Sequence, residues 1–175
     1  MSEKFAAALN DQIANEFSAS MQYVGAAVYY DAETLPRLAA FFYRQAQEER
    51  DHAMMMVQYL IDVDEEVRIP DITGQQSRFD DAVSPVRMAL EQEQRVGEEI
   101  NALFQLARET NEFRAEQFMQ WFVKEQVEEV ALMSDLLNVV ERSKDNLLQV
   151  EDYLARERPG EGEDATAPPV AGSAA

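Results

Sequence analysis

The sequence predicts an all-α fold: a four-helix bundle with one long crossover connection and a short fifth helix at its C-terminal end. Three observations lead to this prediction. Apolar residues recur at steps of three and four along most of the chain, and no segment alternates as a strand does. Four of the helical segments run for about 25–30 residues, or about 40 Å, which is typical of bundles. One connection of about 20 residues has no helical pattern.

The helices start at residues that favour helix entry. Pro36 falls in the first turn of the second helix, where the missing N–H of proline is no loss. Ser84 is expected to cap the third helix with Pro85 at its first position, and Asn111 and Asp145 to cap the fourth and fifth. The helices are therefore expected at residues 4–32, 36–64, 85–109, 112–141 and 145–157.

The connection from Glu65 to Ser84 is long enough to run the whole length of the bundle. At about 3.3 Å per residue it could reach about 60 Å when extended. The second and third helices would then run parallel, with an antiparallel hairpin on each side of the crossover. Ile69, Ile72 and Phe79 are the residues expected to hold the crossover against the helices.

The composition changes after about residue 158. Residues 159–175 are acidic and rich in proline, glycine and alanine, and a segment of this kind cannot bury enough apolar surface to fold by itself. We therefore expect a folded domain at residues 1–158 and a disordered tail at residues 159–175.

Composition also excludes several classes of function. The chain has no cysteine, which excludes disulfides, thiolate metal sites and iron–sulfur clusters. Its formal net charge is −19, from 34 acidic and 15 basic residues, and no basic cluster suited to nucleic acid or an anionic membrane is present. No segment is apolar enough to span a membrane and no signal peptide is recognisable, so we expect a cytoplasmic protein.

Each of the four long helices carries a glutamate within its apolar stripe, far from the helix ends. The four are Glu16, Glu49, Glu93 and Glu129, and helical steps of three and four keep each one on the inward face. One buried glutamate commonly finds a hydrogen bond. Burying a bare carboxylate costs several kcal/mol, however, and four like charges add to that cost. A pair of divalent cations would nearly neutralise the four.

The second helix adds an imidazole to this set. In Glu49-Arg50-Asp51-His52 the glutamate and the histidine are three residues apart and point the same way. Together they could hold one metal ion, with the carboxylate free to bridge to a second, as in di-iron carboxylate bundles. Carboxylates with one imidazole favour iron or manganese, and zinc can compete.

These motifs resemble those of the ferritin family, over about residues 5–157. The chain is most similar to the non-haem bacterial ferritins, particularly the actinobacterial kind that extends beyond the last helix. The segments that carry the resemblance are Asn15-Glu16-Phe17 with Gln22-Tyr23, Glu48-Glu49-Arg50-Asp51-His52-Ala53, Glu91-Gln92-Glu93-Gln94, Phe118-Met119-Gln120-Trp121-Phe122 and Glu125-Gln126-Val127-Glu128-Glu129.

The resemblance implies two iron ions per subunit and a role for each matching residue. The first iron would be held by Glu16, Glu49 and His52. Glu49 would also bridge to the second iron, which Glu93 and Glu129 would hold.

The resemblance also assigns residues around the pair. Tyr23 would form a hydrogen bond near the irons and supply an electron, and Gln126 would sit beside them. Glu48, Glu125 and Glu128 match a third, inner iron site of bacterial ferritins. The same three residues are equally consistent with a solvated acidic face.

Two departures narrow the family. Bacterioferritins and rubrerythrins repeat the Glu-x-x-His motif on the last core helix, whereas this chain has a single histidine and ends the corresponding stretch with Glu129. Bacterioferritins also bind haem through a methionine directly after the glutamate of the second helix, and that position here is Arg50. The resemblance therefore implies no haem.

The function implied is iron storage with ferroxidase activity. A protein of this kind oxidises Fe(II) with dioxygen or hydrogen peroxide and deposits ferric mineral inside a homo-oligomeric cage of 24 subunits, with the fifth helix at the four-fold axes. Three alternatives remain. A di-iron oxidase or peroxidase without storage would be expected to repeat Glu-x-x-His, and a DNA-binding mini-cage of the starvation-protection type often has a basic tail. A metal-free structural bundle would fill its glutamate positions with water and salt bridges.

Overall fold

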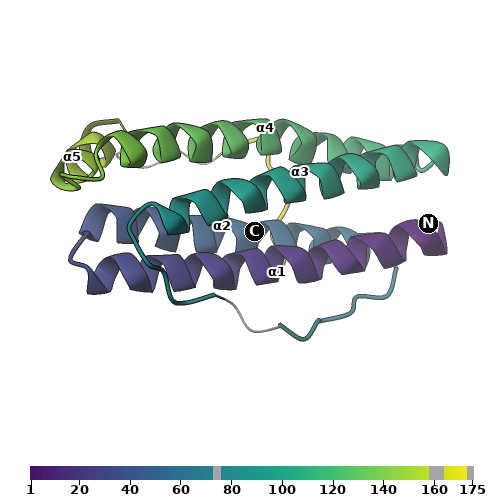
Figure 1. Cartoon of the computed structure of the whole chain (residues 1–175). Coiled ribbons are helices and arrows are strands. Elements are labelled where there is room, and N and C mark those ends of the chain that lie inside the picture. The colour runs from purple at the N-terminus through teal and green to yellow at the C-terminus, as the bar shows by residue number, and fades with distance from the viewer. Residues whose placement is uncertain (73–75, 158–163, 173–175) are drawn as a thin grey trace.

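The computed structural model describes residues 1–72, 76–157 and 164–172, and over these residues it contains five helices and no strand (Figure 1). The all-α prediction is confirmed, and the helix bounds agree with the expected ones to within three residues. The helices are α1 (Glu3–Ala32), α2 (Pro36–Asp62), α3 (Ser84–Glu109), α4 (Phe113–Arg142) and α5 (Leu148–Glu157).

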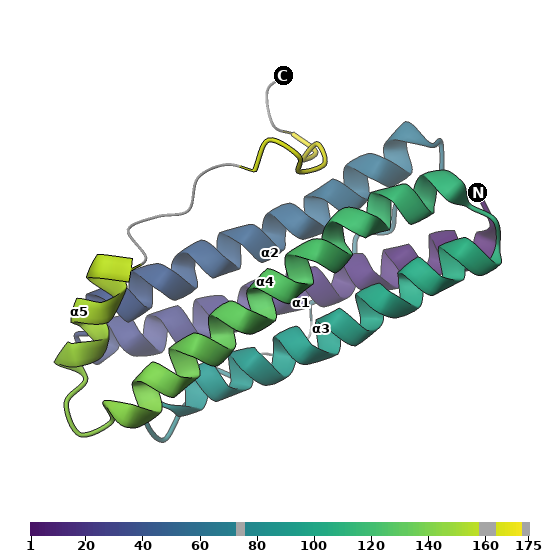
Figure 2. The same cartoon turned by 90° about the horizontal axis from the view of Figure 1, so that it is seen from above.

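The four long helices form two antiparallel hairpins that lie side by side. α1 pairs with α2 and α3 pairs with α4, as Figures 1 and 2 show from two directions. The connection between α2 and α3 returns along α1 to the other end of the bundle. α2 and α3 are therefore parallel, which is the topology that the length of the connection predicted.

Three helices end in the same way, with a non-glycine residue in the left-handed conformation. Thr34, Asp64 and Asn111 follow α1, α2 and α3 with φ angles of 60°, 60° and 58°. In each case the N–H of the next residue donates to the carbonyl five residues before it, which satisfies an otherwise free carbonyl of the last turn. The prediction that Asn111 caps the start of α4 is wrong, because this residue ends α3 instead.

Asp81, not Ser84, holds the start of α3. One carboxylate oxygen of Asp81 accepts hydrogen bonds from the Ser84 hydroxyl at 2.6 Å, the Ser84 N–H at 2.8 Å and the Val83 N–H at 3.0 Å. These bonds, the one from the hydroxyl above all, lower the pKa of Asp81 below its ordinary value. The prediction of Ser84 as the cap is therefore wrong, although Pro85 does lie in the first turn.

Two amide side chains of α1 fasten the crossover to the bundle. Gln22 donates to the carbonyl of Gln76 at 2.7 Å and accepts from its N–H at 3.1 Å. Asn10 donates to the carbonyl of Glu66 at 2.9 Å and accepts from the N–H of Arg68 at 2.7 Å. Each amide thus supplies hydrogen-bond partners to backbone groups of the crossover that would otherwise bond to water.

Of the three apolar residues expected to pack the crossover against the helices, only one does so. Ile69 and Ile72 are 73% and 48% exposed, so for these two residues the prediction is wrong. Phe79 does pack against the core, with its ring 5.4 Å from that of Tyr29. Close contact comes instead at Gly25, where a Cβ atom would lie 2.8 Å from the carbonyl oxygen of Gln76.

Two apolar clusters fill the bundle and leave a polar layer between them. One cluster gathers around Tyr30, Phe42 and Leu136, and the other around Leu9, Leu60 and Met119. On each long helix, residues of one cluster give way to buried polar residues and then to residues of the other cluster. The fold therefore sets its polar side chains at mid-height, where all four helices contribute.

The short helix α5 lies at one end of the bundle and caps α2. Glu151 accepts hydrogen bonds from the N–H groups of Arg37 at 2.8 Å and Leu38 at 2.9 Å. These donors belong to the first turn of α2 and have no partner within their own helix. Over the described residues, no helix is long and apolar enough to cross a membrane.

Residues 164–172 lie against α2 and α4 (Figure 2). Asp164 accepts a hydrogen bond from the indole N–H of Trp121 at 3.2 Å, and the N–H of Ala171 donates to the carbonyl of Met54 at 3.2 Å. The division into a domain and a disordered tail stays a prediction. Residues 159–163 and 173–175 of that tail, and residue 158 of the domain, are outside the part of the chain that the structure describes.

Candidate metal centre

Five ionisable side chains from the four long helices are buried in the polar layer. Their exposed fractions are 1% for Glu16, 1% for Glu49, 7% for His52, 1% for Glu93 and 5% for Glu129. α2 contributes two of them and each other long helix contributes one. The apolar stripes in the sequence predicted this placement.

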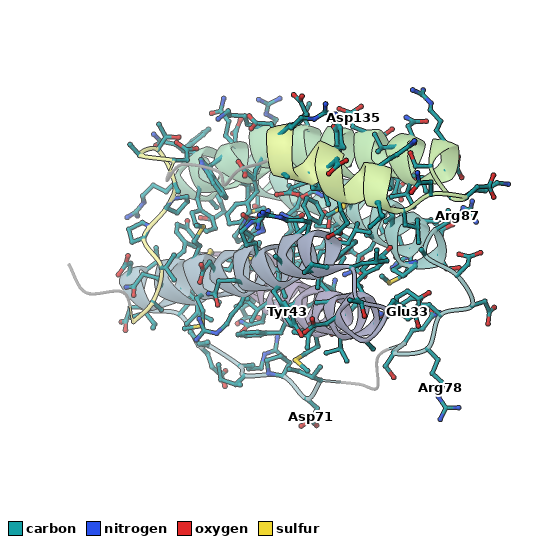
Figure 3. All side chains as sticks on the ribbon, turned by 90° about the vertical axis from the view of Figure 1, so that its left-hand side faces the viewer. Glu33, Tyr43, Asp71, Arg78, Arg87 and Asp135 are labelled. Carbon is teal, nitrogen blue, oxygen red and sulfur yellow. The ribbon has the colours of Figure 1, made fainter. Side chains whose placement is uncertain are left out.

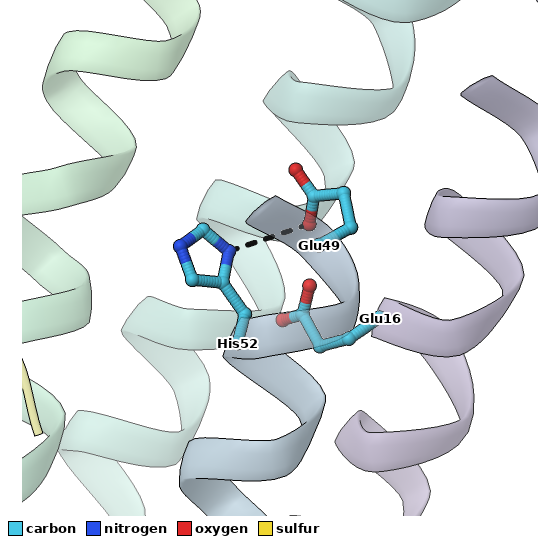
Figure 4. Close-up of side chains that lie close together, drawn as sticks. All are labelled: Glu16, Glu49 and His52. Atoms are coloured by element: carbon cyan, nitrogen blue, oxygen red, sulfur yellow. Dashed lines mark hydrogen bonds and ion pairs between the residues drawn. The ribbon is translucent and has the colours of Figure 1, made fainter. Parts of the chain in front are cut away.

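Three of these residues come together as one group that could hold a metal ion. Glu16, Glu49 and His52 each present one ligand atom, and the three atoms lie within 4.8 Å of one another. Figure 4 shows the two carboxylates and the imidazole converging from α1 and α2. Nδ1 of His52 lies 3.4 Å from Oε2 of Glu49, as three-residue helical spacing allows.

Glu93 is held by two side chains that were also predicted to belong to the site. The hydroxyl of Tyr23 donates to one carboxylate oxygen of Glu93. The side-chain amide of Gln126 donates to the other at 2.6 Å and to the backbone carbonyl of Glu93 at 3.0 Å. The charges of Glu93 on α3 and Glu129 on α4 both raise the pKa of Glu49.

Burial makes the ionised form of these carboxyls costly. It is the main reason that the pKa values of Glu16 and Glu49 lie well above the ordinary value, and the charge of Glu49 raises the pKa of Glu16 further. The pKa of Glu93 is raised by burial as well. The hydrogen bonds from Tyr23 and Gln126 oppose that rise, because they stabilise the carboxylate.

Two carboxylate oxygens in the layer accept no hydrogen bond from an amide, imidazole or hydroxyl group of the described residues. They are Oε2 of Glu16 and Oε1 of Glu49, and both are buried. Buried polar atoms in native proteins are nearly always paired, so these atoms indicate a missing partner. A divalent cation between them would supply it and would offset the charge, and the oxygen and imidazole donors suit iron, manganese or zinc.

The residues predicted for a third iron site lie to one side of this layer. Glu48 and Glu125 line a hollow of about 460 Å³ between α2 and α4, together with His52, Trp121 and the C-terminal segment. Burial raises the pKa of Glu125. In the described part of the chain, neither these two residues nor Glu128 forms a group of three at metal-ligand distances, so this site stays a prediction.

One contact in the site was missed by sequence analysis. Gln12 donates to Oε1 of Glu16 at 2.9 Å and is itself buried. The two residues are four apart on α1, and this helical spacing could have indicated the pair. A second contact, between Trp121 and Asp164, joins a core helix to the tail and has no sequence signal that we can identify.

Comparison with known proteins matches the chain to one family. A family model described as the ferritin-like domain matches residues 6–143. The chain is 50% identical to ferritin BfrB of Mycolicibacterium smegmatis over 171 residues, which cover 98% of this chain and 94% of that protein. It is 31% identical to the bacterial non-heme ferritin of Staphylococcus aureus over 146 residues, covering 83% and 88% of the two chains.

A solved structure shares the fold. It is an open pore ferritin from the hyperthermophilic archaeon Archaeoglobus fulgidus, with a TM-score of 0.86 and 28% sequence identity. The match covers 90% of this chain and 99% of the archaeal chain. The resemblance therefore extends over the whole bundle and includes α5.

Proposed function

The chain belongs to the ferritin family, and on this premise we propose that it is an iron-storage protein that oxidises Fe(II) in its buried carboxylate layer. The observation that carries the proposal is the group of Glu16, Glu49 and His52, with two buried carboxylate oxygens that no amide, imidazole or hydroxyl donor reaches. A structural bundle would gain nothing from this arrangement, because burying unpaired carboxylates is destabilising. Two Fe(II) ions would balance the four carboxylates of the layer.

In the proposed site, the first iron is held by Glu16, Glu49 and His52. Glu49 bridges to the second iron, held by Glu93 and Glu129. Tyr23 and Gln126 orient Glu93 through their hydrogen bonds, so that its carboxylate is already placed when the ion arrives.

The chemistry is a two-electron oxidation of a pair of substrate ions. Each Fe(II) loses one electron, and one dioxygen takes both electrons and two protons to leave as hydrogen peroxide. With hydrogen peroxide as the oxidant, the same electrons and protons give two water molecules. The carboxyls with raised pKa values release protons when iron binds, and carboxylate donors favour Fe(III) over Fe(II).

Storage requires an enclosed volume, and we propose the homo-oligomeric 24-subunit cage of the family. The net charge of −19 supports cation uptake, because an acidic wall attracts Fe(II) and can nucleate ferric mineral. Glu48, Glu125 and Glu128 are proposed as a third iron site beside the pair. No haem is proposed, because Arg50 occupies the position that would have to supply the methionine.

An aerobic Fe(II) titration of the assembled protein tests the oxidation step. The near-ultraviolet absorbance of ferric products should rise in a fast phase that saturates at about two Fe(II) per subunit. Glu49→Ala should lose the fast phase, because it removes the bridging carboxylate. Glu91→Ala, at an exposed position of α3, is the control and should keep it. Wild-type rates equal to those of buffer would contradict the proposal.

Storage is tested separately. After addition of a large excess of Fe(II) in air, the wild-type protein should sediment as a filled cage and show electron-dense cores by microscopy. A fast phase without cores would favour the alternative of a di-iron oxidase or peroxidase that stores no iron. If the protein shows no fast phase and no stoichiometric iron binding, the result would favour the structural bundle.

A further inference from the structure

A second hollow opens on the other side of α4, and its wall combines apolar side chains with polar ones. It lies between α3 and α4 and measures about 520 Å³. Ile100 of α3 and Val123, Val127 and Val130 of α4 form its apolar part, and Gln94, Glu98 and Asn101 of α3 contribute polar side chains. Val127 is 70% exposed, so the hollow is open at the bundle surface.

The inner end of this hollow reaches the candidate metal centre. Gln126 lines the hollow and is only 9% exposed. Its amide donates to the carboxylate and to the backbone carbonyl of Glu93. A molecule in the hollow is therefore separated from a metal-ligand carboxylate by a single side chain.

Gly97 gives Gln126 the room to lie there. A Cβ atom at Gly97 would be 3.1 Å from Cγ of Gln126, which is tighter than nine in ten such contacts. Glycine inside a helix costs about 1 kcal/mol relative to alanine, and this glycine lies in the middle of α3. Space for the Gln126 side chain is the physical reason for glycine at this position.

We propose that this hollow is the route by which dioxygen reaches the metal pair, with Gly97 as the residue that positions Gln126 at its inner end. Dioxygen is small and non-polar, and apolar cavities readily take up such gases, as they do xenon. This hollow offers a hydrated Fe(II) ion one carboxylate, that of Glu98. The hollow on the α2 side offers four, those of Glu48, Asp51, Glu125 and Asp164, and therefore attracts the cation more strongly. Cation and oxidant therefore approach from opposite sides of α4.

The inference rests on the proposed ferroxidase function, and the test compares two oxidants. Val123→Phe and Val130→Phe fill the hollow, and Val28→Phe adds the same side chain at an exposed position of α1. We expect the dioxygen concentration for half-maximal oxidation rate to rise about threefold or more in the two filled variants, with a maximal rate within about twofold of wild type. The rate driven by hydrogen peroxide, which is polar, should not change.

Two readouts that need no oxidation accompany the rates. Anaerobic Co(II) titration should give wild-type stoichiometry in the filled variants, which shows that the ligands are intact. The ¹²⁹Xe chemical shift under xenon pressure should report binding in wild type and Val28→Phe, and should lose that contribution in Val123→Phe. Gly97→Ala should change the visible spectrum of bound Co(II), because Gln126, which holds Glu93, must shift by a few tenths of an ångström.

The outcomes separate the inference from the function on which it rests. An unchanged dependence of the rate on dioxygen concentration in both filled variants would overturn the route. An equal loss of oxidation rate with dioxygen and with hydrogen peroxide would overturn it as well. An unchanged Co(II) spectrum in Gly97→Ala would overturn the positioning role. If the wild-type protein shows no Glu49-dependent oxidation, the proposed function fails, whereas the xenon measurement still decides whether the hollow admits a non-polar gas.

Discussion

Tyr23 on α1 and Glu93 on α3 are joined by a hydrogen bond across the middle of the bundle, although 70 positions separate them in the sequence. Burial and the nearby charge of Glu93 raise the pKa of Tyr23 well above its ordinary value. The phenol therefore keeps its proton and remains a donor throughout the physiological pH range. Through this bond, packing of the two hairpins fixes one carboxylate of the site.

Replacing Tyr23 by phenylalanine should destabilise the metal-free protein and weaken its second metal position. Loss of a donor to a buried carboxyl costs about 1–3 kcal/mol, to be measured by urea unfolding. Anaerobic Co(II) titration should show one of two binding steps weakened, because Glu93 loses its orientation. Tyr43→Phe, at a residue 42% exposed (Figure 3), is the control and should change neither quantity. Equal losses in the two variants would contradict the role of the Tyr23 bond.

The raised carboxyl pKa values predict that the metal-free protein loses stability as the pH rises. In the folded state Glu16 and Glu49 hold protons at pH values where the unfolded chain has released them. The folded state therefore binds more protons, and its stability falls between the unfolded pKa, near 4.3, and the raised folded pKa. Each such carboxyl lowers the free energy of unfolding by about 1.4 kcal/mol per pH unit in that window. Urea unfolding between about pH 5 and pH 8 measures the slope.

A buried glutamine and a bound cation provide the controls for this pH dependence. Glu49→Gln should flatten the slope, since it removes one titrating group and a charge that raises the pKa of Glu16. Saturating Zn(II) should reverse the sign of the slope, because the metal binds the deprotonated carboxylates. A slope that is the same in wild type and Glu49→Gln would show that surface repulsion, not the buried layer, causes the effect.

Hydrophobic periodicity predicted the bundle and the inward glutamates because it depends on many residues at once. The helix ends depend on one or two residues each, and there the prediction failed. Asn111 is favourable both at a helix start and in the left-handed conformation that ends a helix, and the sequence does not distinguish the two. Ser84 is a good cap in isolation, but Asp81 lies close enough to replace it.

Contacts between segments far apart in the sequence were the other feature that the sequence did not predict. Glu16, Glu49 and His52 were predicted because each sits in a regular stripe. The amides of Gln22 and Asn10, which fasten the crossover, form hydrogen bonds with backbone groups. Every residue has these groups, so the sequence does not indicate which of them will be a partner. For the same reason, Ile69 and Ile72 were assigned a packing role that the structure gives to hydrogen bonds.

Gly25→Ala should loosen the crossover despite its favourable effect on helix propensity. Alanine gains about 1 kcal/mol in a helix, but the new Cβ atom would lie 2.8 Å from a backbone oxygen of Gln76, which cannot rotate away. The crossover must shift, and the hydrogen bonds of Gln22 should weaken with it. Trypsin should then cleave faster after Arg78, which projects from the crossover into solvent (Figure 3).

A second variant identifies the cause of faster cleavage. Gln22→Met keeps the length of the side chain but removes both hydrogen bonds to Gln76, so it should also expose Arg78 to trypsin. Val28→Ala, on an exposed part of the same helix, should leave the rate unchanged. Wild-type cleavage rates in Gly25→Ala would mean that the crossover tolerates the extra atom.

The C-terminal segment can be tested against the expectation of disorder, because the chain has one tryptophan and that residue contacts the segment. The indole N–H of Trp121 donates to Asp164, which also accepts hydrogen bonds from the N–H and the hydroxyl of Thr166 at 2.8 and 2.7 Å. The bonds from Thr166 are the main cause of a pKa of about 2 for Asp164, so its carboxylate stays ionised at neutral pH.

Asp164→Ala should therefore detach the segment from α4 and expose Trp121. We expect a red shift of the tryptophan emission in the metal-free protein and stronger quenching by acrylamide, since the indole loses a partner and gains contact with water. Asp135→Ala removes the same charge from an exposed position of α4 (Figure 3) and should change neither quantity.

Because the pKa of Asp164 is depressed, the wild-type emission should stay constant from about pH 8 down to pH 4 and shift only below that range. If wild type and Asp164→Ala have the same spectrum and the same quenching, residues 164–172 do not occupy this face in solution, and the tail is disordered as its composition predicts.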